Sequence, residues 1–343
     1  NKVGNEFLVN TLSTANIQSY PVISMNNSYF AIAWQSNNGD DGTSGYSVKV
    51  RTYETSTGNA VGNEFVANSY IASDQLNPSI AISSVNNNIL VGWQSNGQDG
   101  NGWGVYGRRF TYNGTGIGNE FKVNTTTTSA QYDPSVAYNP NNNTFIFAWA
   151  DNYNADAYVR FQRYDANGIA QSSEATAFSY SANAVGNTNI KIDQNGNFVV
   201  AWDYSADGSG YGVYARRYDD LGVAQAANFR INTYSTSDQS GVSMSMNKAG
   251  NMIFSWHSAG QDGNGYGIYG QRYSTYSRTI EPAVSQINGE TKVNRFTLDD
   301  QKSPSSAIDD SGNMVVVWQS DLLDTSLNGI YGQRYDSSGN PVG

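Results

Sequence analysis

Short apolar runs separated by polar turns recur along the whole chain. Typical runs occupy residues 198–202 and 314–318, and each ends at a tryptophan. The turns between runs are rich in Asn, Asp and Gly, which accept the backbone conformations of tight turns. No stretch of eleven or more residues keeps apolar positions at the i, i+3, i+4, i+7 spacing of an amphipathic helix. The pattern therefore predicts an all-β chain.

Six tryptophans, 53 to 62 residues apart, mark an internal repeat. They are Trp34, Trp93, Trp149, Trp202, Trp256 and Trp318. Each is followed by an arginine in a segment rich in tyrosine and phenylalanine, and then by a segment resembling Gly-Asn-Glu-Phe. This periodicity overrules the two or three domains that length alone suggests. We expect a single domain of six repeats, at residues 4–61, 62–117, 118–170, 171–224, 225–287 and 288–343.

Each repeat contains four short strands. In the second copy we expect them at residues 78–83, 88–94, 104–110 and 120–124. Four strands per repeat, six repeats and no helix are typical of a six-bladed β-propeller with four-stranded antiparallel blades. A solenoid is the alternative, but its coils are usually shorter, at roughly 20 to 30 residues.

The two ends of the chain suggest how the propeller closes. Residues 4–10 have the sequence of a fourth strand with no first three strands before it, whereas the last copy ends before a fourth strand of its own. We therefore expect the N-terminal strand to complete the last blade, which would leave no long edge unpaired.

Composition excludes several classes of function. The chain is 38% hydrophobic and 13% aromatic, so it can build a core, and it has no cysteine for disulfides or thiolate metal sites. A net charge of −10 and the lack of a basic run argue against binding to nucleic acid or to anionic membranes. No apolar run is long enough for a transmembrane helix or a signal peptide, so we expect no membrane insertion.

Three segments carry a resemblance to a known family. Residues 118–125 (GNEFKVNT), 197–202 (NFVVAW) and 261–273 (QDGNGYGIYGQRY) resemble repeats of very large secreted bacterial surface proteins of the adhesin type. The resemblance runs along essentially the whole chain and weakens at residues 150–153 and 171–174. It implies an extracellular or cell-surface location and a binding or structural role without a defined catalytic site. It also implies that calcium-binding repeats often lie nearby, but it supplies no ligand.

In a four-stranded meander, the loop between the second and third strands lies on the same side as the link to the next blade. Candidate ligand-binding residues gather there: Asp99, Trp103, Asp207, Tyr211, Asp262 and Tyr266. Such a surface could hold sugars by stacking and hydrogen bonding, or calcium through oxygen ligands. Asp-Gly-Asn-Gly is also what a tight hairpin requires, so a purely structural role is the simpler interpretation. No cofactor is required by the sequence, and the metal ligands, if calcium binds, stay unassigned.

The other recurrent residues indicate structure. The six repeated tryptophans end the most apolar strand and are expected in the core. Nine of the twelve arginines fall in the third strand, where we expect them to pair with the glutamate of the fourth strand.

Catalysis finds little support in the sequence. His257 is the only histidine, so neither a Ser-His-Asp set nor a multi-histidine metal site can be built. We therefore expect no enzyme, but a non-catalytic extracellular module for adhesion or surface assembly. Its partners would be a cell-surface glycan, a protein or other copies of itself. A lectin-like propeller is one alternative. A secreted polysaccharide-cleaving enzyme using Asp151, Asp203 or Asp321 is another.

Overall fold

A computed structural model describes residues 5–12, 17–37, 45–153, 156–181, 184–205, 209–275, 284–321 and 328–343. These residues form strands β1 to β24 and no helix. They cluster into two compact units, Asn1–Tyr153 with Phe161–Ala175 and Asn154–Arg160 with Thr176–Gly343. Within the described ranges, no helix exists that could cross a membrane.

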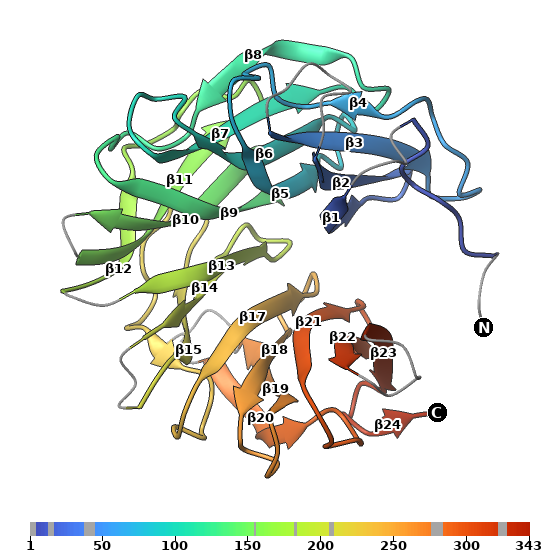
Figure 1. The fold of residues 1–343 in the computed structure, drawn as a ribbon, viewed down its shortest axis with the longest axis vertical. Helices are drawn as coiled ribbons and strands as arrows, with labels where there is room; N and C mark the ends of the chain where they lie inside the picture. Colours follow the sequence, from blue (N-terminus) through green and yellow to red (C-terminus); the bar gives the residue numbers. More distant parts are fainter. Residues whose placement is uncertain are drawn as a thin grey trace. The chain divides into compact units, whose positions relative to one another are not determined.

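The first three sheets are antiparallel meanders of consecutive strands (Figure 1). The first two lie in the first unit, and β11 and β12 of the third fall partly in the second unit. Their strands are β1 (Gln18–Met25), β2 (Tyr29–Asn37), β3 (Tyr46–Glu54), β4 (Phe65–Val66), β5 (Gln75–Ile82), β6 (Ile89–Asn96), β7 (Trp103–Phe110), β8 (Gly116–Lys122), β9 (Ala130–Asn139), β10 (Thr144–Tyr153), β11 (Asp156–Asp165) and β12 (Ala175–Ser181).

The second unit contains three more sheets with the same strand order. Their strands are β13 (Val185–Ile192), β14 (Phe198–Tyr204), β15 (Gly212–Tyr218), β16 (Phe229–Arg230), β17 (Gln239–Met246), β18 (Met252–Ala259), β19 (Tyr266–Thr275), β20 (Val284–Lys292), β21 (Gln301–Ile308), β22 (Met314–Asp321), β23 (Asn328–Tyr335) and β24 (Pro341–Val342).

Six four-stranded antiparallel blades make this an all-β, six-bladed β-propeller, as the repeat predicts. The solenoid alternative is wrong, because every sheet is built from four strands that follow one another in the chain. In the second copy the first three strands match the prediction closely. The fourth, β8, begins earlier than predicted, at Gly116. A register shift in this pair of strands lets Gly116 pair with Phe110 at the C-terminal end of β7.

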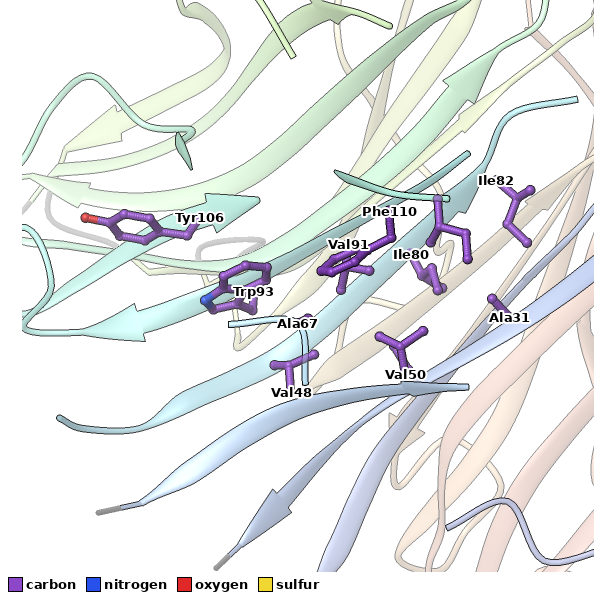
Figure 2. Packing of buried hydrophobic residues seen from close by; sticks show 12 residues of the cluster. Ala31, Val48, Val50, Ala67, Ile80, Ile82, Val91, Trp93, Tyr106 and Phe110 are labelled. Carbon is purple, nitrogen blue, oxygen red and sulfur yellow. The ribbon is translucent and has the colours of Figure 1, made fainter. Parts of the chain in front are cut away.

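The core is made by apolar side chains that stack between neighbouring sheets. Figure 2 shows Trp93 and Val91 of β6 packed with Val48 and Val50 of β3, while Ile80 of β5 lies beside them. All six repeated tryptophans are buried, with at most 7% of their surface exposed. Two of their indole N–H groups donate to a glutamine of the first strand: Trp34 to Gln18 at 2.9 Å and Trp93 to Gln75 at 3.0 Å.

The first strand of each sheet contains a bulge. Its residue has a positive φ in every copy: Tyr20, Asn77, Asp133, Asn187, Gly241 and Ser303. At three junctions, the side chain that follows the buried tryptophan accepts the N–H of this residue from the next sheet. Gln35 accepts from Asn77 at 3.1 Å, Gln94 from Asp133 at 3.0 Å and Asp203 from Gly241 at 2.6 Å. The positive φ turns the N–H out of its own sheet towards that acceptor.

The last sheet has a fourth strand from its own copy, and its completion by the N-terminal strand stays a prediction. The fourth strand of the last sheet is β24, which pairs only through Arg334 with Val342 and Tyr335 with Pro341. Residues 5–12 belong to no strand. β24 was not predicted because it has only two residues, at the position of the isolated bridges Tyr53–Ala60 and Tyr218–Ala224 in other sheets.

A cavity of about 50 Å³ lies between the fifth and sixth sheets. Ile253, Thr291, Met314, Val316 and Tyr335 are among the residues that line it. Thr291 pairs with Gly270 just as Phe121 pairs with Gly107. Phe121 fills the space against Tyr164 of the next sheet, with ring centroids 5.4 Å apart. The cavity therefore exists because threonine replaces phenylalanine in this copy.

Replacing Thr291 by phenylalanine should stabilise the protein. At about 24 cal/mol per Å³ of cavity removed, filling this space contributes about 1 kcal/mol to the free energy of unfolding. Chemical denaturation of Thr291→Phe and of the control Thr291→Val, which adds no ring, measures the gain. A Thr291→Phe variant less stable than Thr291→Val would show that the cavity has the wrong shape for the ring.

Candidate functional site

Two of the repeated glutamates, Glu120 and Glu290, fix the loops that precede the first and third strands. Glu120 accepts the N–H and the hydroxyl of Ser69 at 2.8 and 3.0 Å and also the side-chain amide of Gln98. Glu290 does the same with Thr233, at 2.5 and 2.8 Å, and with Gln261 at 2.6 Å. One carboxylate thus ties a hairpin loop to the link between two sheets.

The predicted pairing of third-strand arginines with these glutamates is wrong where the contacts are defined. Arg51 donates to the carbonyl of Val9 at 2.9 Å, and Arg109 donates to that of Ala166 at 2.7 Å. Arg216 donates to the carbonyl of Ala177 at 3.2 Å. The guanidinium groups donate to backbone carbonyls, because the carboxylates are already taken by backbone N–H groups.

Aspartates on the links to the next sheet also have backbone partners. Asp238 accepts the N–H of Tyr211 at 3.0 Å, and Asp300 accepts the N–H of Tyr266 at 3.1 Å. Asp74 accepts that of Tyr46 at 3.0 Å. Much of the acidic character predicted for this surface therefore has a structural origin.

Five of the six predicted ligand-binding residues lie in the described part of the chain. Asp99 and Asp262 support their own hairpins, and each leaves no room for a side chain at Gly104 or Gly267, where a Cβ atom would lie 2.8 or 2.5 Å from a carboxylate oxygen. Trp103, Tyr211 and Tyr266 are half-buried near the starts of third strands. Asp207 lies outside the described residues. Among the residues that the structure describes, no three His, Asp or Glu side chains are grouped to hold a metal ion.

One of these residues, Tyr266, belongs to a cluster between the fifth and sixth sheets. We call Ser240, His257, Tyr266, Asp300 and Lys302 the Tyr266 cluster. The His257 ring meets the Tyr266 ring edge-on, with centroids 5.1 Å apart. The Lys302 ammonium lies 4.6 Å from the centroid of the tyrosine ring and 2.5 Å from a carboxylate oxygen of Asp300. An imidazole, a phenol, a cation and a carboxylate therefore share one partly exposed position.

The charge state of the cluster follows from its surroundings. Burial, and secondarily the positive charge of Lys302, lower the pKa of His257 from 6.5 to about 4, although Asp238 and Asp300 oppose this. The hydrogen bond from Lys302 lowers the pKa of Asp300, and the same bond raises the pKa of Lys302. At neutral pH the cluster holds a neutral imidazole beside an ion pair.

The geometry does not make a catalytic triad. Nε2 of His257 lies 3.0 Å from the hydroxyl of Ser240, and the direction of the proton depends on the tautomer. Nδ1 is buried and has no hydrogen-bond partner among the described residues, so no carboxylate orients the ring. The ring instead lies against Gly241, where a Cβ atom would be 2.4 Å from it.

Tyr266 was predicted from the sequence, but Ser240 and Lys302 were not, and His257 entered only as a single histidine that argued against catalysis. The available signal was departure from the repeat. His257 stands where other copies have Gln35, Gln94 or Gln319, and Lys302 stands where the second copy has Leu76. Both departures occur at adjacent positions of neighbouring sheets.

Comparison with known proteins supports the fold. No protein-family model and no curated protein matches the sequence. A protein of unknown function from Dyadobacter fermentans DSM 18053 has a similar structure, with a TM-score of 0.61 and 11% identity over 92% of this chain and 94% of its own. An ulvan lyase of polysaccharide lyase family PL25, bound to -[GlcA(1-4)Rha3S]-, matches with a TM-score of 0.53 and 12% identity over 99% of this chain and 82% of its own. A neuraminidase-like protein from A/bat/Guatemala/164/2009 matches with a TM-score of 0.54 and 8% identity over 94% and 90%.

The neutral state of His257 predicts a loss of stability in acid. Between pH 6.5 and about 4 the unfolded chain binds a proton that the folded protein excludes, so the free energy of unfolding falls as the pH falls through this window. At pH 5 the histidine accounts for a loss of about 2 kcal/mol relative to pH 7. His257→Gln introduces the residue found at this position in other copies. This variant should lack the part of the acid-induced loss of stability that comes from the histidine.

Denaturation of both proteins at pH 7 and pH 5 measures this difference, and their shared carboxylates cancel in the comparison. Equal losses of stability in the two proteins would show that His257 is not held neutral by the fold.

Proposed function

We propose that this propeller is an extracellular, non-catalytic module that binds glycans through the Tyr266 cluster. The observation that carries the proposal is the arrangement of Asp300 and Lys302 beside Tyr266. The side chains of Lys302 and Asp300 are 39% and 31% exposed and lie 2.5 Å apart, so a donor and an acceptor face solvent together. Such a pair matches the neighbouring hydroxyl groups of a sugar, and the tyrosine adds an apolar surface with a polar end.

The rest of the surface agrees with this assignment. The repeated acids and arginines are used to hold loops and sheets together, so a ligand is expected where the repeat is broken. The family resemblance favours a surface location, and the ulvan lyase with a similar fold carries a bound glycan. The absence of an oriented imidazole in the cluster favours binding without cleavage.

Cleavage of a polysaccharide is the second candidate function. The observation that favours it is the neutral imidazole of His257 beside the Ser240 and Tyr266 hydroxyl-bearing side chains, because a neutral imidazole can accept a proton. Incubation with a polysaccharide panel decides between the two. Release of shorter or unsaturated sugars that stops in His257→Gln would establish an enzyme and contradict the non-catalytic proposal.

Lys302→Leu should weaken glycan binding at least tenfold while leaving the fold intact, because leucine occupies the matching position of the second copy. A glycan array identifies the bound sugar, and titration calorimetry with and without EDTA then measures affinity and any calcium requirement. Lys248→Leu is the matched control. Lys248 also forms an ion pair, with an N···O distance of 2.6 Å to Asp310, but it is not part of the Tyr266 cluster. No binding to any glycan by the unaltered protein, with or without calcium, would rule out this function.

A further inference from the structure

The link between the fifth and sixth sheets displays two large apolar side chains. It occupies residues 293–300, and its Phe296 and Leu298 are 60% and 68% exposed. The residues that correspond to Leu298 in three other links are small or polar: Ala72, Thr128 and Thr236, each four positions after a buried asparagine. Exposed apolar side chains that lie together, rather than singly, mark binding surfaces.

The exposure of these side chains follows from hydrogen bonds inside the link. The amide of buried Asn294 donates to the carbonyl of Phe296 at 2.5 Å, and the amide of buried Gln301 donates to that of Leu298 at 2.8 Å. The equivalent bonds hold the link between the fourth and fifth sheets, where Thr236 takes the position of Leu298 and is likewise exposed. Because both carbonyls are held toward the core, the side chain of Leu298 faces solvent. The link and the two sheets that it joins all lie within the second unit.

This link lies directly against the Tyr266 cluster. The carboxylate of Asp300 accepts the N–H of Tyr266 at 3.1 Å. The carbonyl oxygen of Asp299 would be 3.1 Å from a Cβ atom at Gly265, the residue before Tyr266. Leu298 adjoins Asp299 in the chain. An exposed aliphatic side chain therefore stands next to the charged pair of the cluster.

The charges on this segment cancel. Residues 294–302 contain two cations, Arg295 and Lys302, and two anions, Asp299 and Asp300. The ammonium of Lys302 already lies 2.5 Å from a carboxylate oxygen of Asp300. An acidic sugar would bring a second carboxylate to an ammonium that already has one, whereas an uncharged sugar adds no repulsion. The charge balance therefore favours an uncharged ligand.

We propose that the Tyr266 cluster selects uncharged sugars that carry a methyl group, such as a 6-deoxyhexose or an N-acetylated hexosamine. This inference rests on the proposed function. The hydroxyl groups of the sugar bind Lys302 and Asp300, while its methyl group packs on Leu298 and Phe296 extends the apolar surface. Burial of one methyl group strengthens binding about fourfold, whereas a hydroxyl group at the same place loses its water without gaining a partner.

Pairs of sugars that differ at one methyl group test this selection. L-Fucose with L-galactose and L-rhamnose with L-mannose exchange a methyl for a hydroxymethyl group, and N-acetylglucosamine with glucose tests the acetamido group. Titrations of the unaltered protein followed by NMR, which measures weak affinities, should give at least one pair in which the methyl-bearing sugar binds about fourfold tighter or more. Galacturonic acid should bind no more tightly than galactose, and tighter binding of the acid would overturn the proposal.

Three variants separate this inference from the proposed function. Leu298→Thr, which introduces the residue of two other links, should abolish the preference for the methyl-bearing sugar and leave the affinity for its partner sugar unchanged. Lys302→Leu should weaken both sugars equally, and Leu221→Thr, at a leucine of the fourth sheet that is 64% exposed, should change neither. Sugars bound without a methyl preference, or a preference that survives Leu298→Thr, would overturn this inference and leave the proposed function standing. Absence of binding to any glycan would instead contradict the proposed function itself.

Discussion

The buried asparagine that follows a fourth strand is the interaction on which the stacking of sheets depends. Asn124 is 1% exposed and accepts the N–H of Val105, while its amide donates to the carbonyl of Thr126 at 2.5 Å and to Gln131 at 2.9 Å. Asn232 and Asn294 repeat this set, with Gln239 and Gln301 as partners. A buried backbone N–H without a partner would be costly, so this side chain fixes where the chain leaves one sheet and enters the next.

The glutamates, aspartates and positive-φ bulges build on that turn. Once the asparagine sets the path of the link, Glu120 and Glu290 can reach its N–H and hydroxyl groups, and Asp238 and Asp300 can reach the following hairpin. Only 14% of the residues are charged, and in this network many of them hold loops and sheets together. The network also explains why the Tyr266 cluster is distinct: Lys302 is held by an acid that already supports Tyr266, so its ammonium has a fixed position facing solvent.

The periodic part of the structure could be predicted from sequence, because strand period, turn residues and a repeated tryptophan are local signals. The sequence also showed that arginines and glutamates recur in the third and fourth strands, but it did not show which groups they bind. Arg109 and Glu120 fall in neighbouring strands, yet Arg109 donates to the carbonyl of Ala166 and Glu120 accepts from Ser69 in the preceding link, which depends on how sheets stack. The Tyr266 cluster was only partly predicted: Ser240 and His257 pair within the fifth sheet, but Lys302 and Asp300 reach them only when the sixth sheet packs against the fifth.

Hydrogen exchange at the amide of Val105 in Asn124→Ala tests the central claim most directly. If the asparagine is the acceptor that holds the turn, the variant should lose about 2 to 3 kcal/mol of stability, and exchange at Val105 should accelerate at least tenfold, because a buried donor is left unpaired. Unchanged protection at Val105 together with unchanged stability would contradict the account, since the stacking of the sheets would then rest on some other contact.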